Sequence, residues 1–229
     1  DAGPKSIRTF LGTGYSAVSL FFVLSGFVLA YAYFEDGDAP ATFRKKTFWI
    51  ARLARIYPVY LIGFILAAPS TVGRLWAEDQ MAALPKIAGL AVLALGLVQS
   101  WAPQTATSWN VPAWSLSVEA FFYAIFPFVA DRLSLTKSNR QLILNLCVLW
   151  LVSISMPLLF LFSNGDSASV FSNEAPDAPS ALMEMVMYSP LIRLPEFLFG
   201  TILGRLFVRG DLRLGSIWGV GSLVAIVAA

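Results

Sequence analysis

The sequence predicts an all-α fold, a polytopic bundle of transmembrane helices with about six to seven membrane segments. The first observation is composition: 57% of the 229 residues are hydrophobic and only 13% are charged, whereas about 25% are charged in a typical soluble domain. The second is the run VSLFFVLSGFVLAYAYF at 18–34, which contains no charge. Because a helix needs about 20 apolar residues to cross the hydrocarbon core, this run predicts a membrane span. No stretch has the composition of a soluble core, so we expect a single transmembrane domain over residues 1–229.

The individual elements follow from the alternation of apolar runs with polar breaks. After the first span, a basic stretch leads into a short interfacial helix over 47–56. Pro58 stands near the start of the next span, where its missing N–H costs least, and Pro69 is expected to end that span. The predicted spans are residues 14–34, 57–68, 86–101, 113–130, 141–162 and 190–208, with a polar stretch at 70–85, a long acidic loop at 163–189 and a final apolar run from Leu214.

Composition also excludes several classes of function. The net charge of +2 is too small to indicate a nucleic-acid partner, and no basic repeat is present. The chain has no histidine and one cysteine, which excludes histidine-based metal sites and removes the commonest general base. We therefore expect no metal ion and no nucleic acid.

The orientation of the spans is partly contradictory. The positive-inside rule places the basic clusters Arg44–Arg55, Lys137–Arg140 and Arg205–Arg213 in the cytoplasm. Three apolar runs separate the first two clusters, however, and three crossings would put those clusters on opposite faces. Either one of the short runs 57–68 and 86–101 is re-entrant, or one charge cluster does not follow the rule.

Two arginines form the first candidate site. Arg52 and Arg55 are three residues apart, so they are neighbours on one helix face. Two guanidinium groups can hold phosphate oxygens bidentately, which indicates an anionic ligand at the membrane surface. The ordinary alternatives are arginines that extend to the interface to satisfy the topology rule, or that contact anionic lipid head groups.

Polar residues inside two spans form the second group of candidates. Ser25 and Gly26 lie in mid-span, where glycine allows close helix packing and serine can bond to its own helix, so packing is the default interpretation. Glu119 is an ionisable group within an apolar span, which marks a candidate functional residue. Ser115, Glu119 and Tyr123 recur every four residues and predict one polar stripe that faces protein or water. The alternative for Glu119 is a structural hydrogen bond or ion pair.

Three further patterns predict packing rather than chemistry. Arg193 and Glu196 can form a local ion pair at the entry of a span, and the Gly200/Gly204 pair predicts close helix packing. Trp101, Trp109 and Trp114 are expected to mark an interface belt. Stacking of a tryptophan on a sugar ring is a weaker alternative.

Four sequence blocks occur in an order typical of one family. They are FFVLSGF at 21–27, FWIARLARIYP at 48–58, WSLSVEAFFYAIFP at 114–127 and LPEFLFG at 194–200. Together these blocks closely resemble integral-membrane acyltransferase family 3, whose members include O-antigen, exopolysaccharide and Nod-factor O-acetylases and some macrolide acyltransferases. The blocks cover most of the chain, so the resemblance is specific to the family and not to a substrate.

The resemblance implies a bundle of about ten membrane helices in the bacterial cell (inner) membrane. Such an enzyme moves an acyl group, usually acetyl, from cytoplasmic acyl-CoA to a hydroxyl of a glycan, a lipid-linked sugar or a similar acceptor. Arg52 and Arg55 match the paired arginines thought to hold the nucleotide or pyrophosphate part of CoA. Ser25, Gly26 and Phe27 match the family's Ser-Gly-Phe, and Glu119 matches the glutamate of its Trp-Ser-Leu block. In that block, Trp114, Ser115 and Tyr123 are expected to line the site, with Glu119 and Ser25 as candidate catalytic groups.

One departure from the family pattern concerns the general base. The family carries an essential histidine in its first span, and this chain has none. We expect the chain to be a piece of a longer protein that begins after that span and stops within another, and to be inactive alone. A membrane transporter or flippase, or an inactive membrane scaffold, remains the alternative, although no inverted repeat of the transporter kind is visible.

Overall fold

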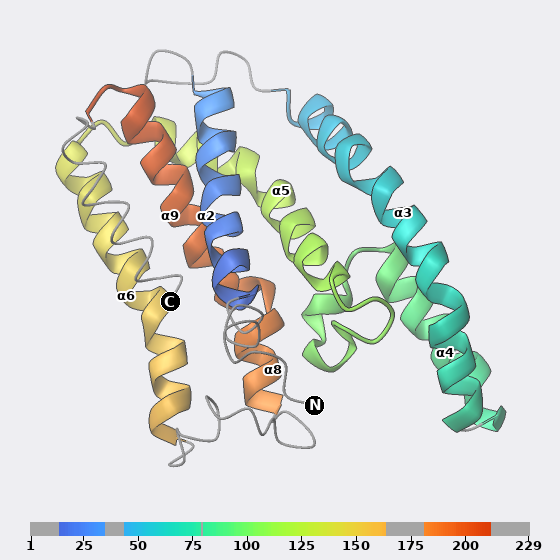
Figure 1. The fold of residues 1–229 in the computed structure, drawn as a ribbon. Helices are drawn as coiled ribbons and strands as arrows, with labels where there is room; N and C mark the ends of the chain where they lie inside the picture. The colour runs from blue at the N-terminus through green and yellow to red at the C-terminus, as the bar shows by residue number, and fades with distance from the viewer. Residues whose placement is uncertain (1–13, 35–43, 79, 164–180, 212–229) are drawn as a thin grey trace, which may run out of the picture. The chain divides into compact units, whose positions relative to one another are not determined.

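The computed structural model describes residues 14–34, 44–78, 80–163 and 181–211 (Figure 1), and the regular structure in this part of the chain is helical, without a β-strand. The all-α prediction is therefore confirmed for these residues. The α-helices are α2 (Gly14–Tyr33), α3 (Lys45–Glu78), α4 (Gln80–Leu95), α5 (Ala113–Ser134), α6 (Asn139–Ser163), α8 (Ala181–Tyr188) and α9 (Pro190–Val208). Two short 3₁₀ helices, η1 (Gln99–Trp101) and η2 (Pro103–Thr105), lie between α4 and α5.

The chain divides into two compact units. Unit 1 comprises Asp1–Thr42, Phe128–Leu158 and Arg193–Ala229, and unit 2 comprises Phe43–Pro127 and Leu159–Ile192. Unit 1 therefore contains α2 and most of α6 and α9, whereas unit 2 contains α3, α4, most of α5 and α8.

Glycines bring α2 and α9 into close contact in unit 1 (Figure 1). A Cβ atom at Gly200 would overlap the backbone of Val23, and one at Gly204 would press on Phe27. Gly26 likewise backs directly onto the Phe197 carbonyl. These contacts confirm the packing interpretation of the Gly200/Gly204 pair and of Gly26, because only a residue without a side chain lets two helix backbones approach this closely.

In unit 2, α3 and α4 form an antiparallel pair. The hydroxyl of Tyr57 donates to the Leu95 carbonyl at 3.0 Å, and that of Tyr60 donates to the Ala94 carbonyl at 2.6 Å. The end of α4 thus lies beside the first half of α3. Helix α5 then runs along α3 in the opposite direction, since its later residue Phe126 stacks on Phe48 with ring centroids 5.4 Å apart.

Residues 96–112 connect α4 to α5 through irregular backbone that side chains hold in place. Thr71 donates to the Trp109 carbonyl at 2.8 Å, and Arg74 donates to the Ser108 carbonyl at 3.0 Å, both from the second half of α3. Ser117 of α5 donates to the Leu97 carbonyl at 2.7 Å. Buried carbonyls outside a helix need such partners, and the side chains of α3 and α5 supply them.

The predicted boundaries in this region were wrong. Pro69 does not end a span, and α3 continues through Pro58 and Pro69 to Glu78. Proline removes one backbone donor but still fits a helix whose freed groups find other partners, and beside Pro69 the Ser70 hydroxyl donates to the Ala67 carbonyl. The polar stretch predicted at 70–85 is therefore helical up to Glu78, and the next helix, α4, includes Pro85 and ends at Leu95 rather than at 101.

Other boundaries agree better with the sequence. The spans predicted at 14–34, 141–162 and 190–208 correspond to α2, α6 and α9. The loop predicted at 163–189 contains α8 in its described part, while the run from Leu214 lies outside the described residues. Among the described helices, α3 and α5 are long and apolar enough to cross a membrane.

The interface belt predicted from three tryptophans was wrong for two of them. Trp109 and Trp114 are only 8% and 6% exposed, whereas Trp101 is 48% exposed. The Trp109 ring stacks on Phe64 with centroids 4.5 Å apart, and its N–H donates to the Phe64 carbonyl at 3.0 Å. These two indoles are therefore part of the packing of unit 2.

Candidate functional site

The site in unit 2 begins with Arg52, which is half-buried on α3. Its guanidinium carbon lies 5.5 Å from the ring centroid of Phe48 and 5.8 Å from that of Tyr123. Phe48 precedes Arg52 by one helical turn and so shares its face, while Tyr123 comes from α5. Two aromatic faces attract the positive charge and hold the guanidinium at the contact between α3 and α5.

Tyr123 connects this arginine to Glu119. The two residues are one turn apart on α5, both are buried, and the Tyr123 hydroxyl donates a hydrogen bond to Glu119 Oε1. The predicted polar stripe is present in this pair. Ser115, its third member, donates to the Pro112 carbonyl at 3.1 Å and so closes the first turn of α5.

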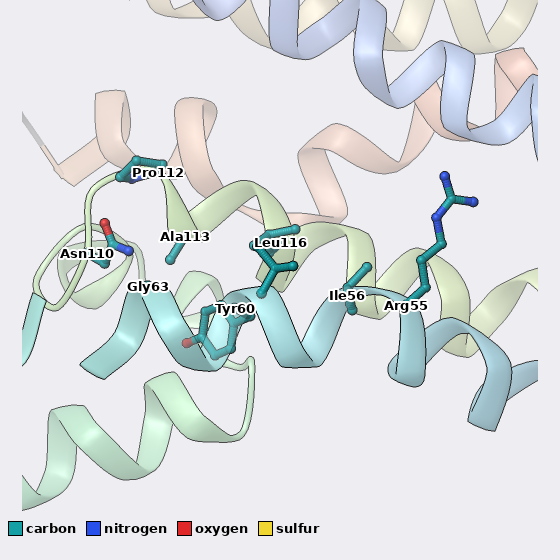
Figure 2. Close-up of a pocket in the computed structure, with 9 residues that line it drawn as sticks. Arg55, Ile56, Tyr60, Gly63, Asn110, Pro112, Ala113 and Leu116 are labelled. Carbon is teal, nitrogen blue, oxygen red and sulfur yellow. The ribbon is translucent and has the colours of Figure 1, made fainter. Parts of the chain in front are cut away.

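Arg55 lies one turn beyond Arg52 and is exposed. Arg55 also stands at one end of a cavity of about 220 Å³, and Figure 2 shows its guanidinium extending away from α3. The two arginines therefore have different surroundings: Arg52 is fixed among aromatic rings, and Arg55 reaches out from the rim of a cavity.

The helices that carry the site are fixed by residues that the sequence did not single out. The indole N–H of Trp49 donates to the Tyr123 carbonyl at 3.2 Å, and the rings of Phe48 and Tyr123 meet edge to face with centroids 6.4 Å apart. Phe48 and Trp49 precede Arg52 by four and three residues, so their spacing could have predicted that both lie beside Arg52 on one face of the helix. Trp114, which the family resemblance implies as a site-lining residue, lies at the start of α5 and meets Tyr188 edge to face with centroids 5.1 Å apart.

The Ser-Gly-Phe candidates belong to unit 1. Ser25 is half-buried in α2, and Phe27 contacts Phe207 with ring centroids 5.6 Å apart. The structure thus brings Arg52, Glu119 and Tyr123 together within unit 2. A catalytic role for Ser25 stays a prediction.

A second buried polar cluster joins α2 and α9 in unit 1. Arg193 and Glu196 form an ion pair at 2.8 Å, which confirms the predicted pairing. Ser19, which the sequence analysis missed, donates to Glu196 Oε1 at 3.1 Å and also accepts a hydrogen bond from Arg193 at 3.1 Å. A single serine within an apolar run predicts such a contact only weakly.

Within the described ranges, no group of three histidine, cysteine, aspartate or glutamate side chains is arranged to hold a metal ion. The chemistry that the described site supports is the binding of an anion. It offers one fixed cation, one exposed cation, a buried carboxylate and an adjoining cavity.

The described part of the chain is a helical protein with two neighbouring arginines beside an aromatic and acidic cluster, an arrangement suited to an anionic ligand. Comparison with known proteins identifies the family, because a family model described as an acyltransferase domain matches residues 3–229. The chain belongs to this acyltransferase family.

Two relatives illustrate the similarity. Acyltransferase MdmB of Streptomyces mycarofaciens is 32% identical over 199 residues, which cover 86% of this chain and 48% of that protein. O-acetyltransferase OatA of Staphylococcus aureus is 25% identical over 170 residues, which cover 70% of this chain and 27% of that protein. The chain therefore spans half or less of the length of these relatives. No solved structure matches it.

Proposed function

We propose that this chain forms part of a bacterial multi-pass membrane O-acyltransferase that takes an acyl group from acyl-CoA and transfers it to a hydroxyl of a cell-surface glycan or a similar acceptor. The observation that carries the proposal is the pair of neighbouring arginines on α3: Arg55 lines a cavity, and Arg52, one turn away, lies against Phe48 and Tyr123. CoA carries phosphate groups, and a pair of guanidinium groups suits them.

The fixed position of Arg52 supports binding of the phosphates. A guanidinium already held by two rings loses little conformational freedom when a phosphate binds, which favours affinity. Arg55 is exposed and can meet a ligand that arrives from water. Its position at the cavity rim would place the phosphates outside and lead the rest of the donor inward.

The proposed reaction transfers the acyl group from the sulfur of CoA to the oxygen of the acceptor hydroxyl. The acceptor hydroxyl gives its proton to a base, its oxygen bonds to the thioester carbonyl carbon, the carbon–sulfur bond breaks, and CoA leaves as the thiol after taking a proton. The family resemblance assigns the base to a histidine, and this sequence contains none. We therefore assign to this chain the binding and orientation of the donor, while the catalytic roles expected of Ser25 and Glu119 stay predictions.

The first prediction tests the donor site in the full-length protein. Replacing both Arg52 and Arg55 with alanine should weaken acetyl-CoA binding by at least about tenfold, because even one lost hydrogen bond to a charged group costs about 1.5–3 kcal/mol. Equilibrium binding of radiolabelled acetyl-CoA to purified protein measures this.

The matched control is Lys86→Ala, an exposed cation of α4 that does not line the cavity. It should bind acetyl-CoA as the wild type does. An unchanged affinity in the Arg52→Ala, Arg55→Ala variant would remove these arginines from the donor site.

A further inference from the structure

A second cavity, of about 320 Å³, lies in unit 2 between the second half of α3 and the segment before α5. The polar side chains that line it are Ser70, Thr71, Arg74, Thr107, Ser108 and Asn110. It adjoins the first cavity, the one that Arg55 lines, because Asn110 and Pro112 line both. Figure 2 shows these two residues at the end of the first cavity away from Arg55. The second cavity therefore continues from that end.

The walls of the second cavity are held in place without a ligand. Thr71 donates to the Trp109 carbonyl at 2.8 Å, and Arg74 donates to the carbonyl of the residue before it at 3.0 Å. Arg74 is the one charged side chain among the described lining residues, and it forms an ion pair with Glu78 at 3.5 Å. Because this charge is compensated, the cavity suits an uncharged ligand better than a phosphate.

The hydrogen-bonding groups of this cavity include both donors and acceptors. The hydroxyls of Ser70 and Ser108 already donate to carbonyls of their own segments, which leaves their oxygens as acceptors. Within the described part of the chain, neither the Thr107 hydroxyl nor the Asn110 side-chain amide has a hydrogen-bond partner. These two groups can both donate and accept. Such a lining matches a ligand with several hydroxyl groups, as on a sugar ring.

The volume limits the ligand to about one ring. An engineered apolar cavity of roughly 150 Å³ holds benzene, so about 320 Å³ accommodates one six-membered ring together with its hydroxyl substituents. The other residues of a longer glycan would remain outside, in water.

The far ends of the two cavities are widely separated along α3. Arg55 and Arg74 are 19 positions apart, or about 29 Å at 1.5 Å per residue, and the hydrocarbon core of a membrane is about 30 Å thick. Since α3 is long and apolar enough to cross a membrane, a ligand of the second cavity is expected to arrive from the face opposite Arg55. A cell-surface acceptor lies on the face opposite a cytoplasmic donor.

Resting on the proposed function, we infer that the second cavity binds the acceptor through one uncharged sugar residue, with Thr107 and Asn110 as its hydrogen-bonding partners. A donor that enters at Arg55 and extends along the first cavity directs its acyl end toward Asn110 and Pro112, where the two cavities adjoin. The acceptor hydroxyl and the thioester then meet at this boundary, and the transfer follows the steps given above.

The experiment measures transfer from radiolabelled acetyl-CoA by the full-length protein in lipid nanodiscs. The acceptor is surface glycan from cells that lack the gene, with its ester groups removed by alkali. Thr107→Val keeps the shape of the side chain and removes its hydrogen bonds, so the KM for the glycan should rise about two- to tenfold. The affinity for acetyl-CoA should stay that of the wild type. Thr107→Trp, which fills the cavity, should abolish transfer and retain acetyl-CoA binding.

Gln104→Ala is the matched control, because Gln104 is exposed on the same segment and does not line the cavity. It should keep the wild-type KM for the glycan. Fragmentation of the product by mass spectrometry should find the acetyl group on an uncharged sugar residue, and acetylation of an acidic residue would contradict the uncharged ligand.

Protection from chemical modification tests the site without relying on turnover. In a Cys147→Ala background, saturating glycan should slow the reaction of Thr107→Cys with a maleimide severalfold, acetyl-CoA should not, and Gln104→Cys should react at the same rate with and without glycan. An unchanged KM in Thr107→Val with full transfer by Thr107→Trp, or protection by acetyl-CoA in place of the glycan, would overturn the acceptor site and leave the donor site standing. Absence of any acetyl transfer by the wild type would instead overturn the proposed function.

Discussion

At the scale of single residues, the site depends on how one cation is held. Arg52 and Arg55 were predicted from spacing to share a helix face, and the structure adds a difference between them. Arg52 lies against Phe48 and Tyr123, whereas Arg55 is exposed. The difference arises from the contact with α5, which the local sequence of α3 does not contain. Spacing therefore predicted the pair but not which arginine is fixed.

Glu119 offers a test that separates chemistry from structure. The buried Tyr123 hydroxyl donates to its carboxylate, and glutamine keeps an oxygen that can accept this bond while removing the charge. We expect Glu119→Gln to retain the wild-type melting temperature and to lose at least about tenfold in transfer activity, measured as O-acetyl content of surface glycans by mass spectrometry.

Glu119→Leu provides the comparison. It removes the acceptor of a buried hydroxyl, which costs about 1–3 kcal/mol, so the melting temperature should fall as well. Full transfer activity in Glu119→Gln would show that Glu119 is the structural hydrogen-bond partner described as the alternative above.

At the scale of helices, the bounds of isolated helices were predicted well and the helical hairpin poorly. Long apolar runs with charged ends gave α2, α6 and α9 to within a few residues. Pro58 and Pro69 misled the prediction of α3, because the consequence of a proline depends on whether neighbouring groups replace the lost hydrogen bond. The irregular segment at 96–112 could not be predicted either, because its carbonyls accept hydrogen bonds from side chains distant in sequence, such as those of Thr71 and Ser117.

The contact between α2 and α9 gives a prediction at the same scale. A methyl group at Gly200 would overlap the backbone of Val23, and overpacking typically costs about 1–3 kcal/mol. Gly200→Ala should therefore lower the melting temperature of the detergent-solubilised protein by several degrees.

Gly89 of α4 is the control position, because a Cβ atom there meets nothing within 4 Å. Alanine favours a helix over glycine by about 0.8–1.0 kcal/mol, so Gly89→Ala should leave the melting temperature unchanged or raise it. Equal melting temperatures for Gly200→Ala and the wild type would contradict the close α2–α9 contact.

At the scale of the whole molecule, membership of the family was predictable because four blocks occur in order along the chain. The number of membrane crossings was not, because run 86–101 has the composition of a span. In the structure α4 returns along α3 only as far as Tyr57, and the following segment runs back to Thr71 and Arg74 before α5 begins. This excursion favours the re-entrant interpretation of run 86–101.

A single crossing by α3 and another by α5 would return the chain to the face from which it started. An even number of crossings is what the positive-inside rule requires of the basic clusters at Arg44–Arg55 and Lys137–Arg140. Helix α3 has 34 residues, or about 51 Å at 1.5 Å per residue, which exceeds the hydrocarbon core of about 30 Å. Its two ends are therefore expected on opposite faces.

Single cysteines introduced into a Cys147→Ala background test this topology, since Cys147 is exposed and would react itself. Lys46 marks the beginning of α3, and Gln104 marks the segment that Arg74 holds at the other end, through Ser108. A membrane-impermeant maleimide should label Gln104→Cys in right-side-out vesicles and Lys46→Cys in inverted vesicles, because the basic end of α3 belongs in the cytoplasm. The Cys147→Ala protein should remain unlabelled in both preparations. Labelling of both cysteines in the same vesicles would mean that α3 does not cross, and an anion site at Arg52 would then not lie at a membrane entrance.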